Sequence, residues 1–197
     1  MYSGNTLCLT KVEKDFAELN FNNCNGSVNK FDQETLEELE VALTVLSSAA
    51  NIRGLLLTSS KPVFVVGADI NEFKSMFTAT KEHFFEAVIR VNSTMSRIED
   101  LPFPSVASIN GFALGGGLEV CLACDYRIIA DNAAVGLPET GLGILPGWGG
   151  TVRLPRLCGF ATAVQWITSA KQQKSDAALK SGVVDAVFPA NQLRKES

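Results

Sequence analysis

The sequence predicts an α/β fold built as one domain. Short apolar runs typical of buried strands alternate along the chain with segments whose apolar residues recur at helical spacing. The 197 residues, 46% of them hydrophobic, are enough to bury one sizeable core. Glycines concentrate in two stretches, Gly111 to Gly117 and Gly141 to Gly150. Such density marks tight turns or places where a ligand approaches the backbone closely.

The first predicted elements are a hairpin and a helix. Residues Leu7 to Val12 and Phe16 to Phe21 alternate between apolar and polar, which predicts two paired strands, and a polar loop follows from Asn22 to Asn29. Asp32 is the expected N-cap of a helix whose leucines recur at helical spacing between Leu36 and Leu46. Strand and helix therefore alternate from the start.

The same alternation continues to the end of the chain. Gly54 to Thr58 and Val63 to Val66 are apolar runs typical of buried strands, and a helix is predicted from Thr80 to Glu99 before a strand from Ser105 to Ile109. The apolar stripe of that helix consists of Phe84, Val88, Val91 and Met95. The later predicted strands are Tyr126 to Ala130, Ala134 to Leu137 and Val183 to Phe188, and the later helices are Gly149 to Leu157 and Thr162 to Ser169.

The charge balance and the start of the chain argue against several classes of protein. The 17 basic and 21 acidic residues give a net charge of -4, whereas nucleic-acid surfaces need clustered Lys and Arg. The first residues lack the basic and apolar regions of a signal peptide, and no apolar run approaches the ~18 residues of a membrane span. We therefore expect a cytoplasmic protein without nucleic-acid partners and, because its five cysteines are an odd number, reduced thiols.

Three other motifs are better explained by structure than by chemistry. Cys121-x-x-Cys124 has no second cysteine pair, so the two residues are interpreted as small apolar side chains on one helix face. His83 is the only histidine and lies outside both glycine clusters, which argues against a Ser-His-Asp triad. The glycines between Gly141 and Gly147 have the wrong spacing for a dinucleotide fingerprint. No metal site is expected.

One isolated carboxylate follows the first glycine stretch. Glu119 is the only charged residue between Asn110 and Cys124, and the apolar residues around it predict a buried helix that begins inside the glycines. The start of such a helix presents free N–H groups to a negatively charged oxygen. A carboxylate in apolar surroundings is either paired or has a raised pKa suited to proton transfer. Close packing of the helix on a strand is the alternative explanation of the glycines.

A second isolated carboxylate and a strand end complete the candidate site. Glu139 is the only ionisable residue in the glycine-rich segment Gly136 to Gly147, so it forms a candidate acid-base pair with Glu119. The alternative is that each glutamate caps a helix or binds backbone amides. The turn Gly67-Ala68-Asp69 can present the Ala68 N–H to a cavity, while Asp69 is expected to cap the following helix.

These segments resemble the crotonase (enoyl-CoA hydratase/isomerase) superfamily over essentially the whole chain. The resemblance rests on Gly67 to Ile70, Asn110 to Glu119 and Leu137 to Thr151, which occur in the family's order. Gly26 to Asp32 and Gly147 to Gly159 are most similar to the alpha subunits of bacterial fatty-acid β-oxidation complexes. The resemblance implies the crotonase (ClpP-like) fold of repeated ββα units. It also implies that residues 1–197 are an N-terminal part of a longer multifunctional chain, without the fold's C-terminal helices.

The resemblance also implies a reaction and its residues. Ala68 and Gly116 would donate their N–H groups to the thioester oxygen as it becomes an enolate. Glu119 would activate water and Glu139 would protonate the alpha carbon, so that trans-2-enoyl-CoA is hydrated and, through the same enolate, a double bond moves from position 3 to 2. The residues that would contact the substrate are Gly67, Asp69, Gly115, Gly147, Trp148 and Lys30. Coenzyme A enters as part of the substrate, and no further cofactor is implied; NAD belongs only to a downstream dehydrogenase part.

Two departures from the family pattern affect substrate binding. Asn71 stands where many relatives have Lys, so contacts to the coenzyme A phosphates are left to Lys30, Lys74 or other residues. Trp148 is larger than the usual residue, which would narrow the acyl pocket. For the whole protein the resemblance implies a thiolase beta subunit as partner, and it is compatible with a homo-oligomer. The alternatives are an inactive docking or scaffold domain and another crotonase reaction through a CoA enolate.

Overall fold

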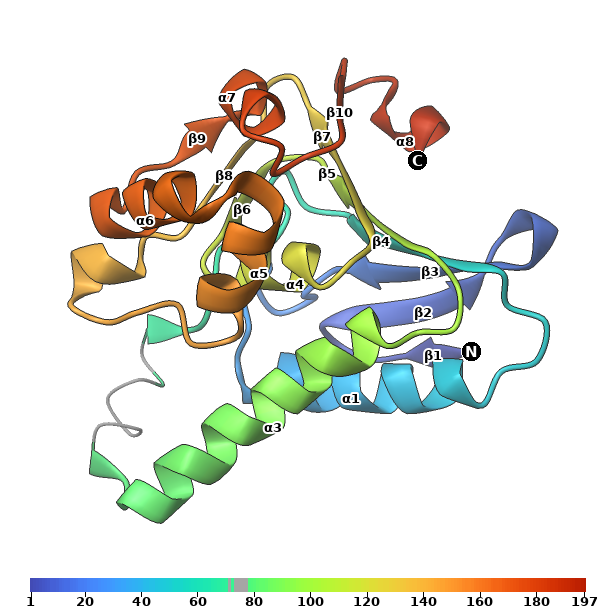
Figure 1. Cartoon of the computed structure of the whole chain (residues 1–197). Helices are drawn as coiled ribbons and strands as arrows, with labels where there is room; N and C mark the ends of the chain where they lie inside the picture. Colours follow the sequence, from blue (N-terminus) through green and yellow to red (C-terminus); the bar gives the residue numbers. More distant parts are fainter. Residues whose placement is uncertain (71, 73–77) are drawn as a thin grey trace.

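A seven-stranded, mostly parallel sheet forms the frame of the structure (Figure 1). This computed structural model describes residues 1–70, 72 and 78–197. The sheet contains, in order, β1 (Tyr2–Ser3), β2 (Leu7–Lys11), β3 (Phe16–Phe21), β4 (Gly54–Ser59), β5 (Ser105–Ile109), β7 (Tyr126–Ala130) and β10 (Ala186–Phe188). A three-stranded sheet contains β6 (Phe112–Leu114), β8 (Ala134–Gly136) and β9 (Gln173–Lys174).

The helices form two groups. Helices α1 and α3 pack together at the bottom of Figure 1, whereas α4 to α7 gather around the smaller sheet. The bounds of the α-helices are Gln33–Ser47 (α1), Lys81–Glu99 (α3), Gly116–Leu122 (α4), Gly150–Cys158 (α5), Phe160–Ser169 (α6), Ser175–Lys180 (α7) and Leu193–Glu196 (α8). Two 3-10 helices are η1 (Glu13–Asp15) and η2 (Glu139–Leu142). None of the described helices is both long and apolar enough to cross a membrane.

The core follows from the strand register. Leu9 lies opposite Leu19 in the antiparallel β2–β3 hairpin, Leu19 lies opposite Leu57 of β4, and Leu57 lies opposite Ala107 of β5. All four side chains are buried, so one row of apolar residues crosses four strands. This register confirms the predicted hairpin and the predicted strands Gly54 to Thr58 and Ser105 to Ile109.

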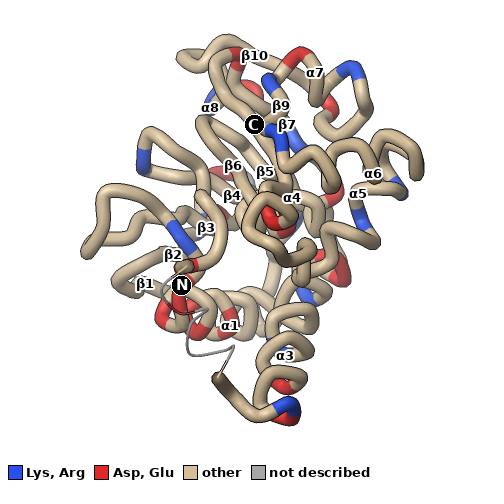
Figure 2. The backbone as a smooth tube through the Cα atoms, turned by 90° about the vertical axis from the view of Figure 1, so that its left-hand side faces the viewer, with Lys and Arg blue, Asp and Glu red and all other residues tan. Residues whose placement is uncertain are grey.

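Helices α1 and α3 confirm their predicted starts. The Asp32 side chain accepts a hydrogen bond from the Thr35 N–H (2.9 Å), as an N-cap does. Acidic positions recur along α1, and both signs of charge occur along α3 (Figure 2). Across the two helices Arg90 binds the Glu40 carboxylate through Nε and Nη2, each at 2.7 Å.

The predicted apolar stripe of α3 is buried at one end only. Val91 and Met95 belong to the core, but Phe84 is 42% exposed and its neighbours Phe85 and Ile89 are 54% and 60% exposed. The reason is geometric, because the N-terminal half of α3 extends beyond the sheet (Figure 1). The predicted apolar stripe is therefore buried in the C-terminal half of α3 and exposed in the N-terminal half.

Two predicted strands differ from the structure. The segment Val63 to Val66 is not a strand and makes one isolated bridge, between Val65 and Ala113. A regular ladder does not form there because the Phe64 and Val65 N–H groups both donate to the Phe112 carbonyl. The final strand is shorter than predicted, since the Val183 and Val184 N–H groups donate to Ala178 at the end of α7. Helices α7 and α8 and the short strands β1, β6 and β9 were not predicted.

Gly117 allows α4 to pack directly on the segment before Gly67. A Cβ atom at position 117 would lie 2.0 Å from the Val65 carbonyl oxygen, which belongs to rigid backbone. Gly117→Ala is therefore expected to lower the free energy of unfolding by about 1–3 kcal/mol. Urea unfolding measures this change, and Gly141→Ala is the matched control, because its Cβ would meet its nearest neighbour at an ordinary 3.4 Å. Equal losses in both variants would contradict the packing explanation.

Candidate active site

Glu119 lies in the first turn of the wholly buried helix α4 and is itself 2% exposed. Its Oε1 atom accepts hydrogen bonds from the backbone N–H groups of Trp148 and Gly150, both at 2.8 Å. Gly149, between the two donors, has a φ of 103°, a left-handed conformation that favours glycine. The turn before α5 therefore holds one carboxylate oxygen of Glu119 in place.

Glu139 begins η2 and is 9% exposed. Its carboxyl group lies against the start of α4, since a Cβ atom at position 115 would be 2.9 Å from Glu139 Oε1. The pairing of β6 with β8 explains this position, because Leu114 lies opposite Gly136 and the Gly115 N–H donates to the Gly136 carbonyl at 2.9 Å. The second oxygen, Oε2, is buried without a hydrogen-bond partner among the residues that the structure describes.

Ala68 turns its N–H group away from its bridge partner. Phe31 donates its N–H to the Gly67 carbonyl and accepts from the Asp69 N–H, both at 2.8 Å, so the bridge of Phe31 with Ala68 uses the groups on either side of Ala68. Gly67 has a φ of 94°, which a glycine adopts without strain. Gly116 is the first residue of α4, where a backbone N–H has no partner within the helix.

The segments that carry these two N–H groups lie side by side. The Leu114 N–H donates to the Val65 carbonyl at 3.0 Å, and a Cβ atom at position 115 would lie 3.7 Å from Gly67 Cα. Within the described part of the chain, no hydrogen-bond acceptor is recorded for either the Ala68 or the Gly116 N–H. The fold thus places two available backbone donors next to both carboxyl groups.

Trp148 and Phe31 form an aromatic wall beside these donors. Their rings meet edge to face with centroids 5.4 Å apart. A Cβ atom at position 116 would lie 2.3 Å from Cζ3 of Trp148, so the indole ring covers the start of α4. The backbone of Trp148 therefore holds Glu119 while its side chain contacts Gly116.

Burial dominates the electrostatics of both glutamates. It is the largest of the effects that together raise the pKa of Glu119 from 4.5 to about 7. The Gly150 N–H lowers this pKa, the nearby Glu139 carboxyl raises it further, and the Trp148 N–H and Arg153 lower it. Burial also raises the pKa of Glu139. Two carboxyl groups with raised pKa values in one buried site are suited to proton transfer near neutral pH.

Glu119→Gln is expected to stabilise the fold at alkaline pH. The folded pKa of about 7 exceeds the ordinary 4.5, so stability that is fully present below pH 4.5 is lost as the pH rises through 7. At pH 8 this loss is at most about 3 kcal/mol, and Gln avoids it while keeping an oxygen for the Trp148 and Gly150 donors. Urea unfolding of both proteins at pH 5 and pH 8 measures the effect. A stability difference that does not change with pH would contradict it.

Other predicted site residues lie around this centre. Lys30 forms an ion pair with Asp69, so the two predicted substrate contacts bind each other. The Gly147 carbonyl accepts a hydrogen bond from Asn92 Nδ2 on α3 at 2.8 Å. Asn71 and Lys74 lie outside the described residues.

The structure adds residues that the sequence reasoning missed. Gly150 donates to Glu119, Asn92 binds the turn beside it, and buried Arg153 donates to the Trp148 carbonyl at 3.2 Å. The glycines flanking Trp148 were a signal for Gly150, but nothing in the sequence marks Asn92 among the many polar residues of α3. His83 is exposed, and Cys121 and Cys124 are buried. The described residues contain no group of three or more His, Cys, Asp or Glu that could hold a metal ion.

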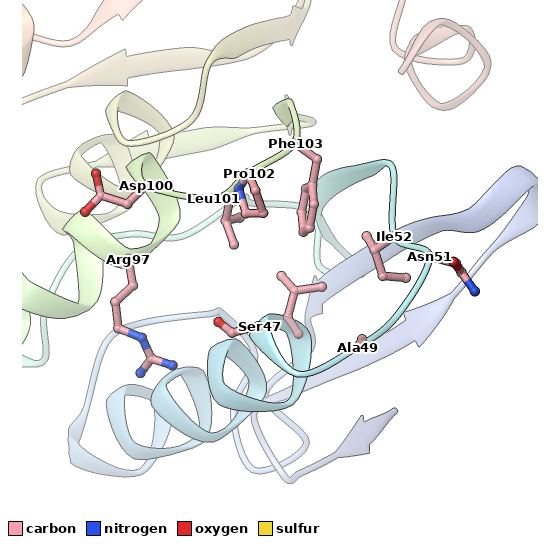
Figure 3. Close-up of a pocket in the computed structure, with 10 residues that line it drawn as sticks. Ser47, Ala49, Asn51, Ile52, Arg97, Asp100, Leu101, Pro102 and Phe103 are labelled. Carbon is pink, nitrogen blue, oxygen red and sulfur yellow. The ribbon is translucent and has the colours of Figure 1, made fainter.

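A cavity of about 430 Å³ is lined by residues outside this site. It opens between the end of α1 and the segment that follows α3, with Ile52, Leu101 and Phe103 in its wall (Figure 3). Arg97 at its edge is engaged by the Glu40 carbonyl and the Thr44 hydroxyl. Because neither Glu119 nor Glu139 lines it, we place the candidate site at the two glutamates instead.

This architecture is the crotonase fold. It superposes on an enoyl-CoA hydratase from Bacillus anthracis with a TM-score of 0.88 and 36% identity, covering 97% of this chain and 73% of that one. An enoyl-CoA hydratase from Geobacillus kaustophilus HTA426 gives a TM-score of 0.91 with 32% identity, covering 99% and 72% of the two chains. The enoyl-CoA hydratase/isomerase family model matches residues 12–197, and the chain belongs to this family.

Curated relatives narrow the similarity further. The fatty acid oxidation complex subunit alpha of Pseudomonas aeruginosa (strain LESB58) is 48% identical over 194 residues, and that of Psychrobacter sp. (strain PRwf-1) is 47% identical over 195 residues. The matches cover 98% and 99% of this chain but 27% of each relative. The chain therefore spans about a quarter of the length of these proteins.

Proposed function

We propose that this chain hydrates trans-2-enoyl-CoA thioesters to 3-hydroxyacyl-CoA. The observation that carries the proposal is the meeting of two buried carboxyl groups with two available backbone donors: Glu119 and Glu139 beside the Ala68 and Gly116 N–H groups. Membership of the enoyl-CoA hydratase/isomerase family supports the same substrate class.

The geometry is compatible with Glu119 acting as the base and Glu139 as the acid. Glu119, with one oxygen held by two N–H groups, would take a proton from water while the water oxygen attacks carbon 3. Burial favours the protonated form of Glu139, which would give its proton to carbon 2. Between these events negative charge would collect on the thioester oxygen, where the Ala68 and Gly116 N–H groups would stabilise it. One water is thereby added across one double bond.

The same site would support isomerisation of a 3-enoyl to a 2-enoyl thioester. That reaction removes a proton at carbon 2 and returns one at carbon 4, with the same enolate between, and therefore needs the same donors and a carboxyl group on the reacting face. The Oε2 atom of Glu139, which has no hydrogen-bond partner among the described residues, supports a proton-transfer role of this kind.

Loss of enoyl absorbance on mixing the protein with crotonyl-CoA tests the proposal. Saturable turnover is the expected result. Calorimetric titration with butanoyl-CoA, a saturated analogue, separates the alternatives when turnover is absent: binding without hydration would indicate another crotonase reaction, and no binding would indicate a docking or scaffold domain. Either outcome contradicts the hydratase proposal for this chain.

We further propose that the reaction belongs to fatty-acid β-oxidation within a longer multifunctional protein. Identity of 47–48% to fatty acid oxidation complex alpha subunits supports this setting. A thiolase beta subunit would be the partner of the whole protein. Co-purification of the full-length protein from its own cells, followed by identification of bound subunits and their stoichiometry, tests both the partner and self-association.

A further inference from the structure

We propose that Arg153 is a positioning residue, which fixes the Trp148 carbonyl and thereby aims the Trp148 and Gly150 N–H groups at Glu119. Arg153 lies in the first turn of α5, and its hydrogen bonds go to Glu99, Ser96 and the Trp148 carbonyl rather than to Glu119 or Glu139. It would act through the turn before α5, which we call the donor turn and define as residues 147–150. The inference rests on the proposed function, in which Glu119 is the base.

The guanidinium group of Arg153 is held on several sides. Arg153 is 8% exposed, and its Nε and Nη2 atoms donate to Glu99 Oε2 at 3.0 and 2.7 Å. Nη2 also donates to Ser96 Oγ at 3.3 Å, and Nη1 donates to the Trp148 carbonyl at 3.2 Å. A buried arginine with this many directed contacts has little freedom to move.

The carbonyl that Arg153 binds lies between the two donors to Glu119. It belongs to the peptide unit joining Trp148 to Gly149, and the flanking peptide units carry the Trp148 and Gly150 N–H groups, so fixing the central unit restricts both neighbours. Gly149 makes the contact possible, since a Cβ atom there would lie 2.0 Å from Arg153 Nη1. One carboxylate oxygen is thus aligned by one guanidinium group through three consecutive peptide units.

Helix α3 provides the support for the donor turn. Asn92, Ser96 and Glu99 follow one another at spacings that place them on one helix face, and Asn92 Nδ2 binds the Gly147 carbonyl at 2.8 Å. The first two residues of the donor turn are therefore attached to α3, Gly147 through Asn92 and Trp148 through Arg153. The ion pair of Arg90 with Glu40 attaches α3 in turn to α1.

The charge of Arg153 adds a second effect that separates positioning from plain structural support. Arg153 lowers the pKa of Glu119 and Glu139 raises it; these are the charged groups that act on Glu119 in the described structure. Strand β6, which also packs against α4, brings no charged side chain, and Arg156 on α5 is exposed. Glu99 partly offsets the charge of Arg153. Removing Arg153 and removing Glu99 should therefore shift the Glu119 titration in opposite directions.

The experiment measures crotonyl-CoA hydration against pH for the wild type and for Arg153→Gln, Arg153→Lys and Glu99→Gln. Arg153→Gln is expected to lower kcat about 10- to 100-fold, with KM nearly unchanged, and to move the acid limb of the pH profile upward. Arg153→Lys should restore part of both, and Glu99→Gln should move the acid limb downward. Arg156→Gln, an exposed arginine on the same helix, is the matched control and should match the wild type.

A second readout does not depend on turnover. The Glu119 carboxyl of protein labelled with ¹³C at glutamate Cδ is titrated by NMR, its signal being assigned by its loss in Glu119→Gln. Opposite shifts of this titration in Arg153→Gln and Glu99→Gln support the proposal, whether or not the wild type hydrates crotonyl-CoA. Absence of hydration by the wild type would contradict the hydratase function but not the positioning role of Arg153. An unshifted titration in folded Arg153→Gln and Arg153→Lys overturns the proposal, as does equal loss of thermal stability with unchanged pH profiles.

Discussion

Glu119→Gln is expected to lower kcat for crotonyl-CoA hydration by about 10²- to 10⁴-fold, the usual contribution of a general base. Glutamine keeps an oxygen for the Trp148 and Gly150 donors, so the donor turn stays in place and only the proton-accepting capacity is lost. Glu139→Gln should cause a loss of similar size, because it removes the proton for carbon 2. Steady-state kinetics at saturating substrate measures both changes.

The roles of the two glutamates can be distinguished by a reaction that needs only one of them. In deuterated water, exchange of the carbon 2 protons of butanoyl-CoA involves the group at carbon 2 but no attack of water on carbon 3. Glu139→Gln should abolish this exchange, and Glu119→Gln should retain it. Glu82→Gln, at an exposed position of α3, is the control for both assays. Hydration at the wild-type rate in either site variant would contradict the assigned roles.

Gly116→Pro is expected to lower kcat by about 10²- to 10³-fold, the cost of losing one donor to a developing oxyanion. Proline removes one backbone N–H, and it is tolerated at the first position of a helix, which Gly116 occupies in α4. The substitution therefore deletes the proposed donor while α4 can still form. Steady-state hydration of crotonyl-CoA measures the loss.

The control for this prediction must account for Trp148. A Cβ atom at position 116 would lie 2.3 Å from the indole ring, so both Gly116→Ala and Gly116→Pro are made in a Trp148→Ala background. The alanine variant keeps the N–H and should retain most of the activity of that background. Equal activity of the alanine and proline variants would show that the Gly116 N–H does not stabilise the transition state.

The sequence predicted local structure wherever a single segment contains its own signal. The side chain of Asp32 caps α1 through an N–H three residues later, and the β2–β3 hairpin pairs neighbouring runs. The prediction of a strand from Val63 to Val66 was wrong. Apolar composition alone does not distinguish a strand from an extended segment, and here the N–H groups donate to the Phe112 carbonyl. Predictions failed where a distant part of the chain decided the hydrogen bonds.

The candidate site shows the same division. Glu119 and Glu139 were recognisable because a single charge in apolar, glycine-rich sequence demands an explanation, and the resemblance supplied Ala68 and Gly116. Arg153 could not be recognised, because its role depends on Glu99, 54 positions away, and on the geometry of a turn. The same helix also contains the exposed Arg156, and the sequence alone does not distinguish the two arginines.

The pairing of β6 with β8 determines where sequence length can vary. Three residue pairs, Phe112 to Leu114 against Ala134 to Gly136, fix the start of α4 relative to η2. A deletion inside either strand would slide one glutamate past the other by about 3.3 Å, more than the length of a hydrogen bond. The turn from Asp131 to Ala133 lies outside this pairing. Insertions in that turn are therefore expected to preserve function, whereas insertions in β8, which follows it, are expected to abolish function.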